Sequence, residues 1–182
     1  MKKLIIYLAA IGITSFLSTS NHPCGGNFLH AQGSRLWSTY YGGAGDEPAF
    51  VLGNSPVSAV TTDASGNVYL AGTTSSTAGI ASGGFDNALG GSQDAFLVKF
   101  SAGGARIWAT YYGGAGVQEG LSVATDAFGN IYLAGATTGS AGVASGGFNN
   151  TYAGGDDAFL VKFDAITGNR IWATYYGGGN GD

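Results

Sequence analysis

The amino-acid sequence predicts an all-β fold, and a long internal repeat is the first reason. Residues 121–176 repeat residues 57–112 motif by motif, and Asp126 follows its counterpart Asp63 by 63 residues. Repetition at a fixed long period is typical of solenoids, propellers and arrays. The second reason is composition, because 34 of the 182 residues are Gly and only 10% are charged. Since Gly is unfavourable inside helices and tolerates positive φ, this composition favours tight turns between short strands.

Each repeat contains four short segments rich in Val, Ile, Tyr, Phe, Trp and Thr, bounded by Gly, Asn, Asp and Ser, as expected of antiparallel strands. The predicted strands, lettered A to D in chain order, are Val57–Thr62, Val68–Thr73, Ala95–Phe100 and Arg106–Tyr112, then Leu121–Thr125, Ile131–Ala136, Ala158–Phe163 and Arg170–Tyr176. A further D-type segment, Arg35–Gly43, precedes them. Four antiparallel strands per repeat form the blade of a β-propeller. We therefore predict an incomplete propeller, with two four-stranded antiparallel blades plus one extra strand.

The start of the chain predicts export. Met1–Lys3 is basic, residues 4–17 form an apolar run, and polar residues follow from Ser18, a pattern typical of a secretory signal peptide. The run is too short to span a bilayer comfortably. Small residues favour cleavage after Ala31, with cleavage after Ser20 as the alternative. We expect a secreted or cell-surface protein without a stable membrane span after cleavage.

Cleavage after Ala31 would remove Cys24, His22 and His30, the only Cys and His residues of the sequence. The residues before Cys24 lack the Leu and small residues of a lipoprotein signal, which argues against lipidation. Without Cys and His, the mature chain could form no disulfide, Ser-His-Asp triad, Cys nucleophile or His-ligated zinc site. It would keep 5 of the 7 basic residues against 11 acidic residues, a net charge of −6. This charge argues against nucleic-acid partners.

These features divide the chain into six segments. We expect a signal peptide in 1–31, a lone outer strand with its connection in 32–56, the first blade in 57–112, a connection in 113–120, the second blade in 121–176, and the start of a truncated further repeat in 177–182. Two blades and a strand cannot close a ring, which needs about four blades or more, so the sequence predicts a fragment of a larger propeller. Exposed blade faces and strand edges predict self-association, including closure of several copies into one ring.

The A–B connections predict structural hairpin turns. Their turn residues are Asp63, Gly66 and Asn67 in the first blade and Asp126, Gly129 and Asn130 in the second. Asp bonds its own backbone at the start of such a turn, and Gly supplies the left-handed conformation. These five-residue turns hold too few oxygen ligands for an EF-hand-like calcium loop. A structural calcium site at Asp94, Asp156 and Asp157 is a separate hypothesis, but these aspartates more simply start strand C and solvate the loop. We expect no metal and no cofactor.

The long B–C connections, 75–94 and 139–157, share a pattern that contains Gly-Gly-Phe. We expect Phe85 and Phe148 to plug each connection onto its own blade. Several positions of these connections differ between the copies, as expected of a binding surface on a repeated frame. Three of the differing pairs are Asp86 and Asn149, Ala88 and Thr151, and Leu89 and Tyr152.

Acidic side chains gather in the D–A connections, which alternating strand direction places at the same end of the blade as the B–C connections. Asp46 and Glu47 lie in the first D–A connection, Glu119 lies in the second, and Asp182 matches Glu47. The candidate ligand-binding residues are therefore Asp46, Glu47, Glu119 and Tyr152. Strand D carries apolar side chains on both faces, so we place Trp37, Trp108 and Trp172 in the core between blades rather than on a sugar-stacking platform.

Four motifs recur in one order from Arg35 to the end of the sequence: YYGG, the TDxxGNxYLAG hairpin, the GGF loop and DAFLVKF. This pattern resembles the SBBP type of bacterial β-propeller repeat. The resemblance implies a propeller of seven blades within a large secreted or surface protein, and it brings no established catalytic residues.

We expect an exported module that is not an enzyme and that acts as an interaction scaffold or adhesin at the cell surface. Its protein or glycan ligand would bind at the loop-bearing end. Nearly every polar residue occurs in both copies, whereas catalysis needs one asymmetric constellation. The alternative is a carbohydrate-active enzyme, a glycoside hydrolase or polysaccharide lyase, that uses loop carboxylates such as Glu47 and Glu119. Glycosidases need two carboxylates about 5–9.5 Å apart.

Overall fold

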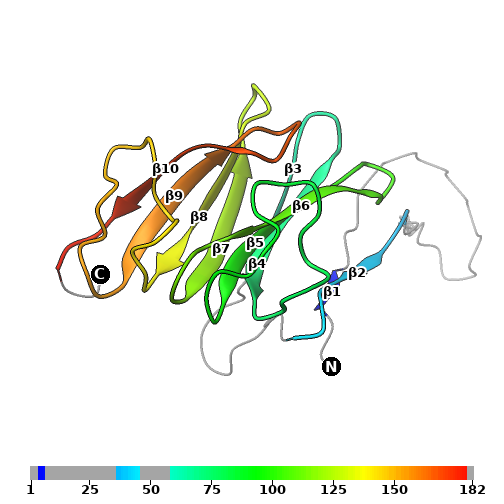
Figure 1. Cartoon of the computed structure of the whole chain (residues 1–182). Coiled ribbons are helices and arrows are strands. Elements are labelled where there is room, and N and C mark those ends of the chain that lie inside the picture. The colour runs from blue at the N-terminus through cyan, green and yellow to red at the C-terminus, as the bar shows by residue number, and fades with distance from the viewer. Residues whose placement is uncertain (1–3, 7–35, 46–57, 180–182) are drawn as a thin grey trace, which may run out of the picture.

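The computed structural model describes residues 4–6, 36–45 and 58–179, in which all regular secondary structure is β-strand (Figure 1). The first sheet consists of β3 (Ser58–Thr62), β4 (Val68–Thr74), β5 (Asp94–Phe100) and β6 (Arg106–Tyr112). The second consists of β7 (Gln118–Thr125), β8 (Ile131–Thr137), β9 (Asp157–Phe163) and β10 (Arg170–Tyr176). In each sheet the strands are antiparallel neighbours in chain order. The predicted all-β fold with two four-stranded blades is confirmed.

A separate two-stranded antiparallel sheet lies beside the first blade (Figure 1). It consists of β1 (Leu4–Ile6) and β2 (Thr39–Tyr41). β2 falls within the predicted extra strand, although it is shorter than that prediction. Both candidate cleavage points of the leader lie outside the described residues, as do Asp46 and Glu47.

β7 begins three residues earlier than predicted, at Gln118 rather than Leu121. Gln118 and Glu119 pair with the last residues of β8, and a β-bulge then shifts the register. The sequence Gln-Glu-Gly has little intrinsic preference for strands, so this extension depends on pairing with β8 and not on local propensity. Glu119, expected in a connection, therefore lies in a strand.

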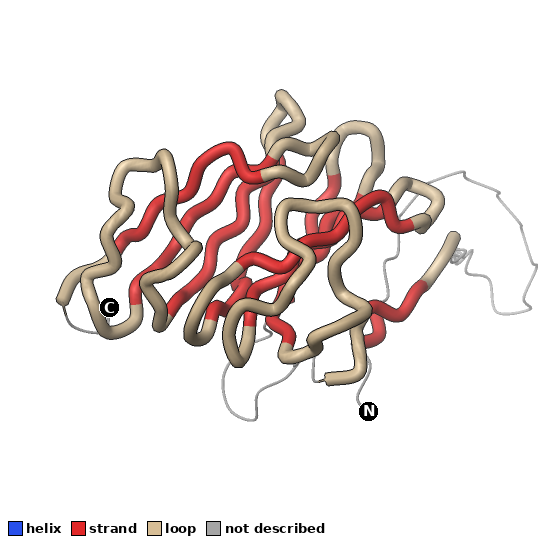
Figure 2. The backbone as a smooth tube through the Cα atoms, viewed as in Figure 1, coloured by secondary structure: helices blue, strands red, loops and turns tan. Residues whose placement is uncertain are grey.

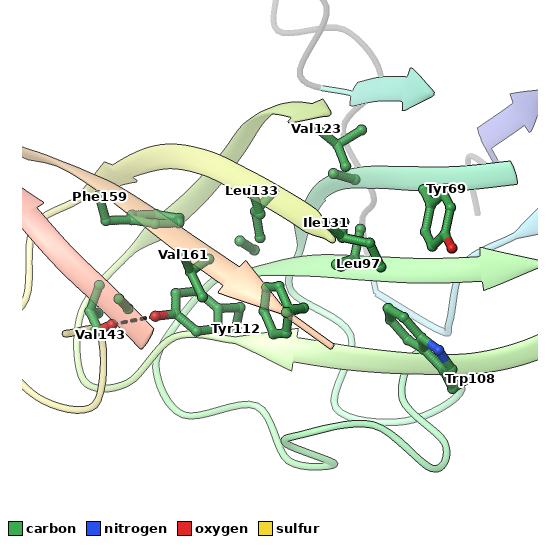
Figure 3. Close-up of a cluster of buried hydrophobic side chains, with 14 of the residues drawn as sticks. Tyr69, Leu97, Trp108, Tyr112, Val123, Ile131, Leu133, Val143, Phe159 and Val161 are labelled. Carbon is green, nitrogen blue, oxygen red and sulfur yellow. Dashed lines mark hydrogen bonds between the residues drawn. The ribbon is translucent and has the colours of Figure 1, made fainter. Parts of the chain in front are cut away.

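The two blades stack face to face, and the larger apolar core lies between them (Figure 3). β7 packs against β3, β4 and β5 of the first blade. The core between the blades includes Tyr69, Leu97, Trp108, Tyr112, Leu133, Phe159, Val161 and Phe163. A second cluster covers the other side of the first blade and includes Tyr41, Val68, Leu70, Ile80, Phe96, Val98 and Phe100. The first blade is therefore buried on both faces, and every residue of β4 and β5 is buried.

The long β4–β5 and β8–β9 connections run back across the outer strands. Figure 2 shows these loops lying around the two sheets. Ser82 exchanges two backbone hydrogen bonds with Ala109 of β6, at 2.8 and 2.9 Å, and Ser145 does the same with Ala173 of β10, at 3.1 and 2.9 Å. Each connection thereby pairs part of the edge of its own blade, which an open sheet would leave unpaired.

Candidate binding surfaces

Tyr112, at the end of β6, fastens the first blade to the second. Its hydroxyl donates to the backbone carbonyl of Val143, in the β8–β9 connection (Figure 3). Its ring centroid lies 5.4 Å from the ring of Phe159 and 5.5 Å from the ring of Phe163. Burial raises the pKa of Tyr112 to about 12, so the hydroxyl keeps the proton that it donates at neutral pH. One side chain thus supplies both apolar area and a hydrogen bond to the junction.

Trp108, four residues earlier, makes the second contact of the junction. Its indole N–H donates to the carbonyl of Ala165, 3.1 Å away, and the ammonium group of Lys99 donates to the same carbonyl at 2.9 Å. The indole ring lies directly over Gly168, where an added Cβ would come within 2.8 Å of the ring. Gly168 has a φ of 71°, so this turn requires Gly both for its backbone conformation and for the close approach of the ring. Trp108 is only 2% exposed, as the predicted inter-blade core requires.

The extra strand repeats both contacts on the opposite face of the first blade. Tyr41 donates its hydroxyl to the carbonyl of Ile80, and its ring lies 5.4 Å from Phe96 and 5.7 Å from Phe100. Trp37 donates to the carbonyl of Ala102 at 2.9 Å. Trp37 and Tyr41 therefore occupy the position that the last strand of a preceding blade would take.

The third copy of this Trp and Tyr pair, Trp172 and Tyr176, has no blade against it within the part of the chain that the structure describes. We define the outer face of the second blade as Tyr132, Ala134, Ala158, Leu160, Trp172 and Tyr176. The counterparts in the first blade, each at most 2% exposed, are Tyr69, Ala71, Ala95, Leu97, Trp108 and Tyr112. By contrast, Tyr176 is 78% exposed and Leu160 is 38% exposed. β5 and β9 have the same sequence, DAFLVKF, yet β5 is buried throughout and β9 alternates between buried and exposed.

A shallow groove borders this outer face. Its volume is about 540 Å³, and its lining residues are Phe148, Asn149, Tyr175, Tyr176, Gly177 and Gly178. The prediction that Phe148 plugs its connection onto its own blade is wrong, because this ring is 95% exposed. Phe85, its counterpart, is 39% exposed and lies between Tyr112 and the Arg170 guanidinium, which is 4.7 Å from its ring centroid. The neighbouring blade, rather than its own loop, therefore decides how far this Phe is covered.

The turn aspartates bind their own loops. Asp63 accepts hydrogen bonds from the Asn67 side chain at 2.8 Å and from the Tyr69 hydroxyl at 2.9 Å, and Gly66 has a φ of 76°. Burial alone would raise the pKa of Asp63, but hydrogen bonds from Asn67, Tyr69 and Ser65 outweigh this effect and lower the pKa. The second turn is equivalent. Its Asp126 accepts from the Asn130 side chain at 2.7 Å, Gly129 has a φ of 80°, and hydrogen bonds led by Asn130 lower the pKa of Asp126 to about 2.

Asp94 and Asp157 occupy equivalent buried positions at the starts of β5 and β9, with 0% and 1% exposure. One carboxylate oxygen of Asp94 accepts from the backbone N–H of Gly90, and one of Asp157 accepts from Ala153, both at 2.8 Å. The other carboxylate oxygen of each residue has no hydrogen-bond partner among the described residues. Burial raises the pKa of Asp94, and the negative charge of Asp86 adds to this effect. The charged carboxylate of Asp94 therefore stabilises its loop through the hydrogen bond from Gly90, but the burial of its charge is unfavourable for folding.

We expect Asp94→Asn to raise the free energy of unfolding at neutral pH by about 1 kcal/mol, because an amide keeps an acceptor for Gly90 without burying a charge. The raised pKa means that the natural protein loses stability as pH rises from the ordinary Asp value through the folded-state value. The variant lacks this loss, so its advantage should vanish near pH 3 and grow toward neutral pH. Urea denaturation across this pH range measures the difference.

Asp86→Asn is the matched control for this prediction. Asn149 replaces Asp86 in the second blade and makes the same loop hydrogen bond, at 2.9 Å compared with 3.0 Å. Loss of the Asp86 charge should raise stability less than Asp94→Asn does, since only the repulsion of Asp94 is relieved. If Asp94→Asn instead destabilised the protein more at neutral pH than in acid, the buried charge would be favourable and the prediction wrong.

Two predicted ligand-binding residues, Glu119 and Tyr152, lie within the described residues, and they lie near opposite edges of the second sheet. Glu119 is half-buried and pairs with Ala136 in the sheet. Tyr152 is also half-buried, with its ring centroid 5.9 Å from Tyr175 and its hydroxyl donating to the carbonyl of Gly155. Of the three differing positions expected to form a binding surface, only the Ala88 and Thr151 position is exposed in both copies. The side chains at the other two positions are half-buried, so part of the difference between the copies reflects packing and not binding.

Gln118 is a structural residue that the sequence analysis missed. It is fully buried, accepts from the backbone N–H of Gly114 at 3.0 Å, and donates to the Ala115 carbonyl at 3.2 Å and to the Thr137 hydroxyl at 3.1 Å. The alignment of the YYGG motifs could have identified it, since Gln118 is the counterpart of Glu47. Its amide closes the β6–β7 connection.

Among the described residues, no group of three or more His, Cys, Asp or Glu side chains could hold a metal ion. Within the same residues, no helix is long and apolar enough to cross a membrane.

Stacked four-stranded antiparallel blades, joined by a repeated Trp and Tyr contact, define a β-propeller repeat protein. Residues 107–140, from β6 to just beyond β8, match the family model described as SBBP, beta-propeller repeat. For these residues the match confirms the resemblance to the SBBP type of β-propeller repeat. No curated protein matches the chain. The number of blades in a closed ring stays a prediction.

Proposed function

We propose that the protein is an exported, non-catalytic scaffold that binds a protein or glycan at the cell surface through the loop-bearing end of its blades. Export is inferred from the signal-peptide pattern of residues 1–31. The binding role is inferred from the repeat architecture, which presents connections of the same kind side by side. Propeller-type folds commonly bind ligands in the concave surfaces that such connections form.

The non-catalytic assignment rests on the hydrogen bonds that the described aspartates accept. Six aspartates accept hydrogen bonds from backbone N–H groups of their own turns or loops: Asp63, Asp86, Asp94, Asp126, Asp157 and Asp164. Asp63 with Asp126 and Asp94 with Asp157 make these contacts in equivalent places of the two blades, and Asn149 makes the contact of Asp86 in the second blade. Most of these contacts therefore follow the repeat and not a unique site. General acid and base catalysis instead needs a carboxylate that is directed at a substrate. We therefore assign these aspartates to loop structure.

Exchange of residues between the copies provides a test that preserves the fold. Tyr152→Leu installs the residue that the first blade has at the same position, and Leu89 packs there against the core. Glu119→Gln keeps the size of the second candidate and removes its charge. Phe128→Ser is the matched control, because Phe128 is 92% exposed on the β7–β8 turn, at the opposite end of the blade, where the first blade has Ser65.

The natural chain and these variants would be screened for retention on arrays of purified cell-wall glycans and surface proteins. We expect the natural chain to be retained, and Tyr152→Leu or Glu119→Gln to weaken binding at least tenfold, the loss of about 1.4 kcal/mol typical of an important interface residue. Phe128→Ser should bind like the natural chain. Equal retention of all variants would remove this end of the blades as the site. Turnover of a glycan that Glu119→Gln abolishes would replace the scaffold proposal with the carbohydrate-active enzyme.

A further inference from the structure

The junction between the blades shows what covers the outer face of a blade. In the first blade, Trp108 meets a β9–β10 turn with Gly168, and Tyr112 meets a carbonyl and two Phe rings of the second blade. An occupant of the outer face of the second blade needs the same features. It must offer a glycine-containing turn with a free carbonyl, a loop carbonyl, and two Phe residues four positions apart on one strand.

The first blade of this chain offers all of these features on its other face. Its turn has Ala102 and Gly104, its loop has Ile80, and its third strand has Phe96 and Phe100. Trp37 and Tyr41 already use them within the same chain, through contacts equivalent to those at the junction. The segment Arg35–Tyr41 and β10 read R-L-W-S-T-Y-Y and R-I-W-A-T-Y-Y. Because the two segments are nearly identical, β10 of one copy can replace Trp37 and Tyr41 of another.

We propose that a second copy of this chain docks its first blade onto the outer face of the second blade, with Trp172 and Tyr176 taking the places of that copy's own Trp37 and Tyr41. The exchange replaces one Trp and Tyr pair by another and additionally covers the apolar groove beside Phe148. That groove is the counterpart of the surface around Phe85, which the second blade covers through Arg170. The contact is head-to-tail, so it continues along a chain of copies or closes into a ring. It does not depend on the ligand-binding role proposed above.

The extra strand β2 and the incoming β10 of a second copy compete for the same face of the first blade. Two double variants of the full-length chain should therefore have opposite effects on self-association. Trp172→Ala with Tyr176→Ala removes the incoming pair and should weaken self-association at least tenfold, as measured by sedimentation velocity over a concentration series. Trp37→Ala with Tyr41→Ala vacates the receiving face and should strengthen self-association at least tenfold. Phe128→Ser, which changes a 92% exposed aromatic residue at the other end of the blade, should leave self-association unchanged. The proposal would be overturned if the Trp37 and Tyr41 double variant associated no more strongly than the natural chain. It would also be overturned if both of these chains stayed monomeric.

Cross-linking tests the direction of the contact. At the junction within the chain, the Lys99 ammonium group binds the Ala165 carbonyl, so Lys162 of one copy should meet Ala102 of the next. Chains carrying Cys24→Ser and either Lys162→Cys or Ala102→Cys would be treated with a short bismaleimide, separately and mixed. We expect cross-linked dimers in the mixture only. Dimers of the Lys162→Cys chain with itself would show that outer faces meet each other, and would overturn the head-to-tail arrangement.

Discussion

Tyr112→Ala is expected to lower the free energy of unfolding by about 3–5 kcal/mol, the usual loss when a large aromatic side chain is removed from a core. The ring is fully buried between the blades and contacts Phe159 and Phe163. Its removal leaves a cavity in the middle of the junction, and the carbonyl of Val143 loses its donor. Urea denaturation followed by tryptophan fluorescence measures the change, because Trp108 lies at the same junction.

Tyr176→Ala is the matched control for this prediction. Tyr176 has the same place in its repeat but is 78% exposed, so at a concentration where the chain is monomeric the change should stay within about 0.5 kcal/mol. Tyr112→Phe removes only the hydroxyl and should cost about 1 kcal/mol. Equal losses for Tyr112→Ala and Tyr176→Ala would mean that the position in the repeat, and not the neighbouring blade, determines the contribution.

Local features of the sequence were sufficient to predict the strands and turns, apart from the first residues of β7. β6 and β10 begin and end where predicted, because their alternating apolar residues lie between clear turn residues. The Asp-x-x-Gly-Asn turns are defined by hydrogen bonds within five residues, which no distant contact has to provide. The repeat itself then predicted that four such strands form one sheet, since both copies had to satisfy the same backbone hydrogen bonds.

Exposure could not be predicted in this way, because it depends on neighbours outside each repeat. The segment DAFLVKF is buried in β5 and half exposed in β9, although its residues are identical. Phe148 was misplaced for the same reason, since its counterpart Phe85 is covered in part by Arg170 of the following blade. The strand character of Gln118 and Glu119 was missed because it arises from pairing with β8. Sequence therefore predicted the blade well and the surfaces of the blade poorly.

Gly114→Ala is expected to lower the free energy of unfolding by about 3 kcal/mol, at the upper end of the usual effect of overpacking. A Cβ at Gly114 would lie 1.8 Å from the backbone carbonyl oxygen of Ala141, which belongs to the second blade. The equivalent Gly43 faces the same restriction, with the carbonyl oxygen of Ala78 at 2.2 Å. The second glycine of the YYGG motif is therefore required for the close approach of the next blade. Thermal and urea denaturation of the variant measure the loss.

Gly103→Ala is the control, because a Cβ there meets only the Ser101 hydroxyl oxygen, at 3.8 Å, and stability should change by less than about 0.5 kcal/mol. A double-mutant cycle then locates the effect. Once Tyr112→Ala has loosened the junction, the second blade can move away from an added Cβ, so Gly114→Ala should cost at least about 1 kcal/mol less than in the natural chain. Additive losses would mean that Gly114 acts on its own turn, and that the glycine is not needed for blade packing.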